Sequence, residues 1–243
     1  MLKHDSRPNG YFVTGTDTEV GKTLVAAAIL LKLQSQHSRV AAFKPVVAGL
    51  QQVNGEWVNE DLVTLHALCT ADLTVQDICP YQLKQPAAPH IVAEKEDISL
   101  SYETILSSYH HVMNQCDAIV VEGVGGFLVP LNTTHNTADF AQAVDLPVIL
   151  VVGMKLGCIN HALLTAEAIR NRGLELHGWV ANTGADYMPL LDENIQTLSR
   201  LLNTKLLGII PKLEPSLATT PYSLQTIQTI SPFIGLPPAV EQP

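Results

Sequence analysis

Short apolar runs alternate along this chain with longer stretches in which apolar positions recur at helical spacing. Six apolar runs predict strands, at residues 11–15, 40–46, 117–123, 147–153, 176–182 and 206–211. Several of these runs are continuous Val, Ile and Leu segments, which is typical of strands buried on both faces. Five periodic stretches predict helices, at residues 22–36, 60–69, 101–115, 159–172 and 189–203. Gly173 follows the fourth stretch and is a suitable helix stop.

This alternation predicts an α/β fold with a mostly parallel sheet, right-handed crossovers and helices on both faces. We expect one domain over residues 1–243, with residues 1–10 and 232–243 peripheral or frayed, because the last nine residues are rich in proline. The first ten residues lack the apolar segment of a signal peptide. No apolar run approaches the length of a membrane helix. We therefore expect a cytoplasmic protein.

The first predicted strand runs into the loop GTDTEVGKT, residues 15–23, and then into an apolar helix. A strand, a glycine-rich turn and a helix N-terminus gather backbone N–H groups around one anion, as in P-loop NTPases. Lys22 supplies a charge for the β- and γ-phosphates, and the Thr23 hydroxyl is placed for Mg²⁺. Five residues separate Gly15 from Gly21, whereas the standard pattern has four.

The amino-acid composition limits the kinds of molecule that this chain is expected to bind. A net charge of −9 and a pI near 5.4 argue against nucleic acid or an anionic membrane surface. Phosphate binding must therefore depend on a local arrangement of groups. The cysteines are far apart and predict buried free thiols, and no metal site of His and Cys is expected; they are Cys69, Cys79, Cys116 and Cys158.

Two charged residues, Glu122 and Lys44, lie near strand ends, where ligands bind in open α/β sheets, and a further acid, Asp61, lies between them in the sequence. Glu122 ends an apolar strand before a glycine-rich turn, so it is a candidate carboxylate for magnesium, although it could instead cap a helix. The sequence pattern predicts that Asp61 is an acid in the first turn of a helix, where the helix dipole favours a negative charge. Lys44 interrupts a strand near its end. It could be a cation facing phosphates or an anionic substrate, or a lysine that extends to solvent at the sheet edge.

Seven segments of the chain together resemble the dethiobiotin synthetase family. They are YFVTGTDTEVGKT, FKPV, NED, PAAPHI, VEGVGG, LPVILVVGMKLGCINHALLTA and GWVAN. The similarity covers roughly residues 11–213, and the stretch 146–166 is its most specific part. The resemblance implies an ATP- and Mg²⁺-dependent ligase of biotin synthesis. Such an enzyme carboxylates 7,8-diaminononanoate with CO₂ (or bicarbonate as its source) and closes a ring to give dethiobiotin.

The resemblance also implies roles for individual residues. Lys22 and Lys44 flank the carbamate and the transferring phosphate, and Thr18 completes the catalytic set. The implied magnesium environment is Thr23, Asp61 and Glu122. Asn182 corresponds to the residue that reads adenine, and residues 211–213 lie beside the base. The full nucleotide-binding set implied is Glu19, Val20, Gly21, Lys22, Thr23, Leu24, Asp61, Glu122, Gly123, Val124, Gly125, Asn182, Thr183, Pro211, Lys212 and Leu213.

By the same resemblance the protein is a homodimer, in which the carboxylate end of the substrate reaches the Gly153–Asn160 region of a second subunit. Ala48 departs from the family pattern, which commonly has Ser at this position. The departure removes one hydrogen bond to substrate, a loss of about 0.5–1.5 kcal/mol.

Two other functions are compatible with a phosphate-binding loop. A regulatory or partitioning ATPase of the related dimeric class would carry a lysine five residues before Lys22, where this chain has Asp17. A non-catalytic binding module would not need the charged set of Lys22, Lys44, Asp61 and Glu122, which is intact. ATP turnover that depends on diaminononanoate and bicarbonate distinguishes these functions from the ligase.

Overall fold

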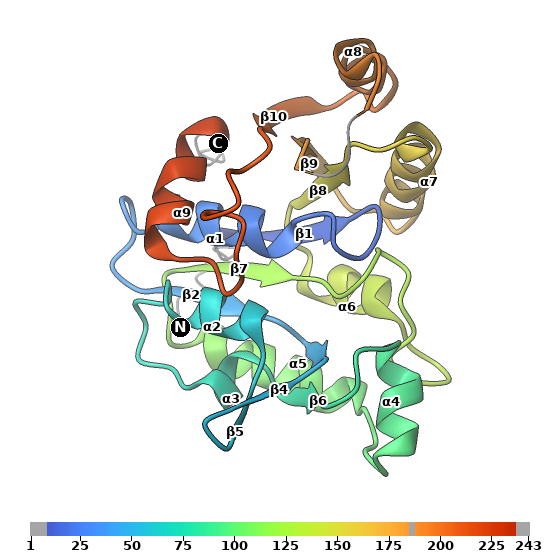
Figure 1. Cartoon of the computed structure of the whole chain (residues 1–243). Helices are drawn as coiled ribbons and strands as arrows, with labels where there is room; N and C mark the ends of the chain where they lie inside the picture. The colour runs from blue at the N-terminus through green and yellow to red at the C-terminus, as the bar shows by residue number, and fades with distance from the viewer. Residues whose placement is uncertain (1–8, 185–187, 237–243) are drawn as a thin grey trace, which may run out of the picture.

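A sheet of six parallel strands forms the centre of the computed structural model, which describes residues 9–184 and 188–236 (Figure 1). The strand order is β10-β9-β8-β1-β7-β2. The strands are β1 (Asn9–Gly15), β2 (Val40–Phe43), β7 (Ala118–Glu122), β8 (Val148–Gly153), β9 (Leu176–Asn182) and β10 (Lys205–Ile210). All six predicted strands lie in this sheet, which confirms the α/β prediction.

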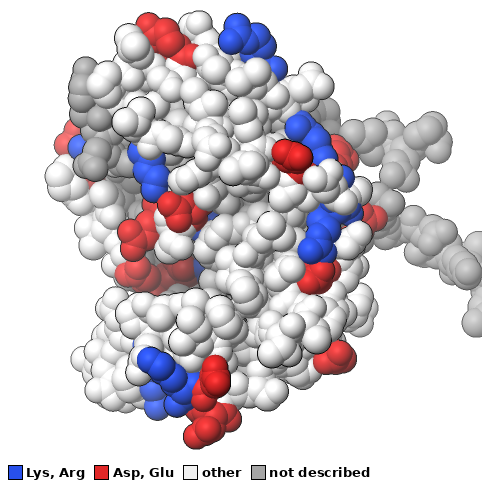
Figure 2. All heavy atoms as spheres, turned by 90° about the vertical axis from the view of Figure 1, so that its right-hand side faces the viewer, with Lys and Arg blue, Asp and Glu red and all other residues white. Residues whose placement is uncertain are grey.

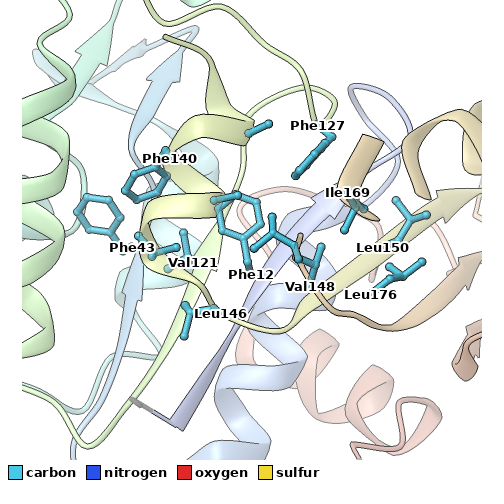
Figure 3. Packing of buried hydrophobic residues seen from close by; sticks show 14 of the residues in the cluster. Phe12, Phe43, Val121, Phe127, Phe140, Leu146, Val148, Leu150, Ile169 and Leu176 are labelled. Carbon is cyan, nitrogen blue, oxygen red and sulfur yellow. The ribbon is translucent and has the colours of Figure 1, made fainter. Parts of the chain in front are cut away.

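Alternate side chains of the sheet enter two hydrophobic cores, one on each face. On one face the Phe12 ring of β1 lies 6.3 Å from that of Phe140, which in turn lies 5.8 Å from Phe43 of β2 (Figure 3). On the other face Tyr11 and Val13 of β1 pack with helices α1 and α9. Burial of each such ring contributes roughly 1.5–3 kcal/mol. Helices therefore cover both faces, as predicted.

The helices α5, α6, α7 and α8 cover the face of Phe12, and α1 and α9 cover the face of Val13 (Figure 1). Their bounds are α1 (Lys22–Leu33), α2 (Glu60–His66), α3 (Val75–Ile78), α4 (Pro89–Lys95), α5 (Tyr102–Met113), α6 (Thr137–Val144), α7 (Cys158–Asn171), α8 (Leu191–Leu201), α9 (Leu224–Ile230) and the 3₁₀ turn η1 (Ser231–Phe233). The five predicted helices correspond to α1, α2, α5, α7 and α8. Each predicted helix extends one to three residues beyond the observed one at one or both ends, except that α7 begins one residue earlier than predicted.

The predicted strand 40–46 is wrong in its last three residues. Its backbone leaves the sheet after Phe43, because the Lys44 N–H donates to the Ile78 carbonyl at 2.8 Å and Pro45 has no N–H. The chain continues as β3 (Val46–Ala48), which pairs with β6 (Tyr81–Leu83) in a separate two-stranded sheet. A hairpin of β4 (Gln51–Val53) and β5 (Glu56–Val58) follows. The break leaves Lys44 at the carboxyl end of β2.

Residues 232–236, in the segment expected to be peripheral or frayed, are anchored to the sheet at Ile234, while Pro232, Phe233 and Gly235 are exposed. The Ile234 side chain is fully buried, and the residue bridges to Gly208 of β10. The Gly235 N–H donates to the Leu207 carbonyl at 2.7 Å. A Cβ atom on Gly208 would lie 2.0 Å from the Phe233 carbonyl oxygen, so this docking needs glycine there. At the other end, residues 9 and 10 already belong to β1; residues 1–8 and 237–243 lie outside the described residues.

Two further observations concern the composition. All four cysteine thiols are free; Cys79 and Cys158 are buried, as predicted, while Cys69 and Cys116 are only half-buried. Within residues 9–184 and 188–236, none of the helices combines the length and the apolar character that crossing a bilayer requires.

Candidate active site

The carboxyl ends of three neighbouring strands meet at one edge of the sheet. β1 pairs with β7 so that Val13 lies opposite Glu122, and β2 pairs with the other side of β7. The loop after β1, Glu122 at the end of β7 and Lys44 after β2 therefore come together, and a cavity of about 1190 Å³ lies between them. Figure 2 shows a hollow in the surface where acidic and basic side chains meet, and over the rest of that face Lys and Arg lie among Asp and Glu.

The loop of residues 15–23 turns into α1 through a left-handed glycine. Gly21 is the N-cap residue of α1 with φ of 91°, and a Cβ atom on it would lie 2.2 Å from the Asn182 Nδ2 atom. Only glycine suits this combination of backbone angle and close approach. The Lys22 ammonium is buried and donates to the Asp17 carbonyl at 2.9 Å, so the lysine curls over the loop.

Two carboxylates and two hydrogen-bond donors meet beside this loop. The Lys44 Nζ atom lies 2.6 Å from Asp61 Oδ2 and 2.7 Å from Glu122 Oε1. The Thr23 Oγ1 atom lies 2.8 Å from Asp61 Oδ1 and 2.9 Å from Glu122 Oε1. Lys44 is 3% exposed and Glu122 is 1% exposed. Burial excludes a lysine that extends to solvent, and the helix after β7 is capped by Asn136, so Glu122 is not its cap.

The position of Asp61 at the start of a helix is confirmed. It lies in the first turn of α2, where the Asn59 side chain caps the helix by accepting from the Asp61 N–H at 3.1 Å. The same turn directs the Asp61 carboxylate to Lys44 and Thr23. Helix capping thus fixes the backbone from which Asp61 reaches the cluster.

Burial and neighbouring charges shift the pKa values of the cluster. Burial lowers the pKa of Lys22 to about 8; Lys44 adds to this shift, and Glu122 and Asp61 oppose it. Burial also disfavours the Lys44 ammonium, but the carboxylates of Glu122 and Asp61 outweigh that effect and raise the pKa of Lys44. For Asp61, the Lys44 charge and the hydrogen bonds outweigh burial and lower the pKa. Burial raises the pKa of Glu122, and Lys44 opposes this shift.

The donor set of this cluster fits magnesium. Thr23 offers a hydroxyl oxygen, and Asp61 and Glu122 offer carboxylate oxygens, which are the ligands that Mg²⁺ prefers. The Glu122 Oε2 atom is buried and has no hydrogen-bond partner in the described part of the chain. A buried carboxylate oxygen without a donor is costly unless a cation or donor reaches it. Three protein ligands also leave room for phosphate oxygens and water, which Mg²⁺ usually keeps.

Most of the predicted nucleotide contacts line the cavity. The lining residues are Glu19, Val20, Gly21, Lys22, Thr23, Leu24, Asp61, Glu122, Val124, Gly125, Asn182, Lys212 and Leu213, together with the predicted catalytic residues Thr18 and Lys44. Gly123, Thr183 and Pro211 are adjacent but do not line it. The Thr183 hydroxyl donates to the Ile210 carbonyl at 2.8 Å, so its only proton is used within the fold.

Asn182 supports the phosphate-binding loop directly. Its Nδ2 atom donates to the Val20 carbonyl at 2.9 Å, and its Oδ1 atom accepts from the Gly184 N–H at 3.1 Å. One amide proton and one lone pair remain for a ligand. The adenine-reading role implied by the resemblance stays a prediction.

Two parts of the cavity wall were not predicted from the sequence. One is a set of apolar lining residues, the apolar wall, formed by Val47, Val129 and residues 86–89 next to Ala48, whose position the resemblance had linked to substrate. The segment PAAPHI was visible in the sequence, but no role was inferred for its prolines. The other part follows the predicted segment 211–213: it is a strap formed by residues 214–222, of which Pro215, Ala218, Thr220 and Tyr222 line the cavity.

Two hydrogen bonds hold the strap to α2. The Thr220 hydroxyl donates to Glu60 Oε2 at 2.6 Å, and the Tyr222 N–H donates to the Thr64 hydroxyl at 3.0 Å. Glu60 directly precedes Asp61, so the strap and the carboxylate cluster share one helix.

Comparison with known proteins places the chain among P-loop proteins. A family model described as an AAA domain (AAA_26) matches residues 9–220. A ParA family ATPase from Chlorobium tepidum TLS is similar with a TM-score of 0.55 and 15% identity, covering 93% of both chains. The septum site-determining protein MinD from Pyrococcus horikoshii OT3, complexed with Mg-ADP, gives a TM-score of 0.53 and 16% identity over 91% of this chain and 86% of that chain. At such identities the likeness shows the P-loop NTPase fold alone.

Proposed function

Because the chain belongs to the AAA_26 family of AAA domains, we propose that it is an ATP- and magnesium-dependent ligase that converts 7,8-diaminononanoate and CO₂ into dethiobiotin. Family membership and fold support nucleotide-hydrolysing P-loop chemistry in general. One observation carries the finer proposal: a second buried lysine, Lys44, is close enough for its charge to act on Lys22, and both lysines line a cavity that apolar side chains also line.

The proposed reaction has three steps. One amine of the substrate adds CO₂ and loses a proton, which gives a carbamate. A carbamate oxygen then attacks the γ-phosphorus of ATP, and ADP leaves. Finally the second amine attacks the carbonyl carbon of the mixed anhydride, phosphate leaves, and the ureido ring closes. No side chain of the protein forms a covalent bond in this sequence.

The second step brings two anions together, so the site must neutralise both. Lys22 and the N–H groups at the start of α1 hold the β- and γ-phosphates. Lys44 lines the same cavity, where it offsets charge on the carbamate and the transferring phosphoryl group. Magnesium, which Thr23, Asp61 and Glu122 would hold, supplies further neutralisation of the phosphates when bound.

The apolar wall fits the alkyl chain of the proposed substrate. Val47, Ala48, Val129 and residues 86–89 offer carbon atoms along one side of the cavity. Removing an alkyl chain from water favours binding by roughly 0.8 kcal/mol for each buried CH₂ group. Ala48 is one of these residues, at the position where the family pattern commonly has Ser.

We propose further that two subunits share the substrate site. The segment Gly153–Asn160 starts at the cavity edge, and Leu156 within it is 96% exposed. Leu164, on the helix that follows, is also exposed. Large apolar side chains on neighbouring exposed turns are typical of surfaces that another protein covers. A second subunit would cover them and place its own 153–160 segment near the substrate.

Mass spectrometry after incubation with diaminononanoate, bicarbonate and Mg-ATP tests the proposed function. We expect dethiobiotin and one ADP for each molecule formed. ATP turnover without either substrate, and without a product, would instead support an ATPase switch. Asp17 argues against the partitioning class, since it stands where that class has a lysine and accepts from Lys155 Nζ at 2.9 Å. Absence of both product and turnover would support a binding module.

A further inference from the structure

We propose that Lys44 positions the two carboxylates of the magnesium site, in addition to any contact it makes with the reacting anions. The inference rests on the proposed function only for the identity of the ion. It assigns to Lys44 a second role, in metal affinity, that can be measured with neither diaminononanoate nor CO₂ present.

The geometry shows a division of oxygen atoms. Lys44 Nζ donates a hydrogen bond to one oxygen of each carboxylate, Asp61 Oδ2 at 2.6 Å and Glu122 Oε1 at 2.7 Å. Of the other two oxygens, Asp61 Oδ1 accepts from the Thr23 hydroxyl, and Glu122 Oε2 is buried without a hydrogen-bond partner among the described residues. The Thr23 hydroxyl also lies 2.9 Å from Glu122 Oε1, the oxygen that Lys44 holds. Lys44 therefore occupies one oxygen of each carboxylate and leaves Glu122 Oε2 without a donor.

The two carboxylates need such a support because they come from unrelated elements. Glu122 ends β7 inside the sheet, and its side chain is 1% exposed. Asp61 lies in the first turn of a short helix, and its side chain is 32% exposed. The two negative charges repel each other, and the Asp61 side chain has solvent to turn into. The Thr23 hydroxyl lies near both carboxylates, but its single proton can serve only one of them at a time. The Lys44 ammonium donates to both at once and so holds Asp61 toward Glu122.

If Lys44 positions the metal ligands, its removal should change metal affinity in the opposite direction from that expected if it acts only through its charge. The ammonium and a divalent cation carry like charges, so Coulomb repulsion alone predicts tighter metal binding once the ammonium is gone. If instead Lys44 holds the ligands in place, its loss should weaken metal binding. Loss of a residue that orients metal ligands typically reduces affinity by about 10–100-fold.

The test is titration of the full-length chain with Mn²⁺ in the presence of saturating ADP, with free Mn²⁺ followed by electron paramagnetic resonance. For Lys44→Met we expect Mn²⁺ affinity to fall by about 10–100-fold, with ADP affinity in EDTA unchanged. Lys44→Arg keeps N–H donors for both carboxylates and should recover part of the loss. Lys205→Met, on the exposed start of β10, removes the same charge far from the cavity and should match the parent protein.

Equal or tighter Mn²⁺ binding by a folded Lys44→Met protein would overturn the proposal. It would show that the Lys44 ammonium competes with the ion and does not support its site. Thermal melting checks that each variant is folded, and Lys44→Gln, which keeps most of the stem, replaces Lys44→Met if the latter does not fold. A parent protein that binds Mn²⁺ and ADP but forms no dethiobiotin would refute the proposed function and leave the role of Lys44 standing.

Discussion

Substitution of Glu122 by Gln removes one charge from the buried cluster and barely changes the volume of the side chain. Glu122 accepts from Lys44 Nζ at 2.7 Å and from Thr23 Oγ1 at 2.9 Å. The Gln carbonyl can still accept, so the loss is the difference between a charged and a neutral hydrogen bond, about 1–2 kcal/mol. For a chain of this length that difference lowers Tm by about 2–8 °C.

The effect on metal binding should be much larger than the effect on stability. The Glu122 Oε2 atom is the buried acceptor without a partner, and a Gln amide would place either N–H donors or a neutral oxygen there. Neither can replace a carboxylate as a magnesium ligand. We expect turnover to fall by about 10²–10³-fold, the cost of losing one preorganised electrostatic group. Nucleotide should still bind in EDTA, because Lys22 and the loop N–H groups are unchanged.

Calorimetric titration of ADP with and without magnesium measures the effect on metal binding, and thermal melting measures the effect on stability. Glu193→Gln is the matched control, because Glu193 is exposed on α8 and the same charge is removed. The parent protein should gain nucleotide affinity from magnesium, and Glu122→Gln should not. If Glu122→Gln keeps both the magnesium requirement and the rate of the parent, Glu122 is not part of the metal site.

Three further outcomes are expected. First, burial holds the pKa of Lys22 at about 8, and bound phosphate favours the ammonium form. Nucleotide affinity should therefore fall as the pH rises through that value, and nucleotide binding should take up protons above it. Calorimetry in two buffers of different ionisation enthalpy measures this uptake, and an absence of proton uptake would contradict the placement of Lys22. Second, at saturating magnesium Lys44→Gln should lower kcat and kcat/KM together by about 10²–10³-fold, whereas a rise in KM alone would show uniform binding. Third, Asn160→Ala and Lys22→Ala proteins should each be poorly active, and mixed dimers should regain activity in the site built from intact halves; full activity in a proven monomer would refute the shared site.

The sequence was sufficient for the strands and for part of the site. Short apolar runs, several of them continuous Val, Ile and Leu, marked all six strands of the sheet, and the positions of Lys44 and Glu122 near strand ends predicted a site at that edge. The sequence could not show that β7 lies between β1 and β2, which is what brings Glu122 to Thr23. For Asp61 the pattern showed a helix start, but not the direction of the side chain.

The parts of the structure that were not predicted have only weak signals in the local sequence. The strap of residues 214–222 and residues 86–88 of the apolar wall are irregular, so they show neither helical nor strand periodicity. Helix α6 is only eight residues long, although its capping box of Asn136 and Asp139 was a readable start signal. The docking of Ile234 depends on Gly208, a contact between distant segments that no local pattern reports.

The order of strands also determines when during synthesis the phosphate-binding loop gains support. β1 is made first, yet Val13 pairs with Glu122 of β7 and with Ile149 of β8. At about 5–20 residues per second, a ribosome needs roughly 7–30 seconds to extend the chain from the end of β1 to the end of β8. β1 has no partner strand until β7 is made and lacks its second partner until β8 is made, and such long-range parallel pairing is slow to form. The strand that leads into the phosphate-binding loop therefore stays unpaired until about half of the chain has been synthesised.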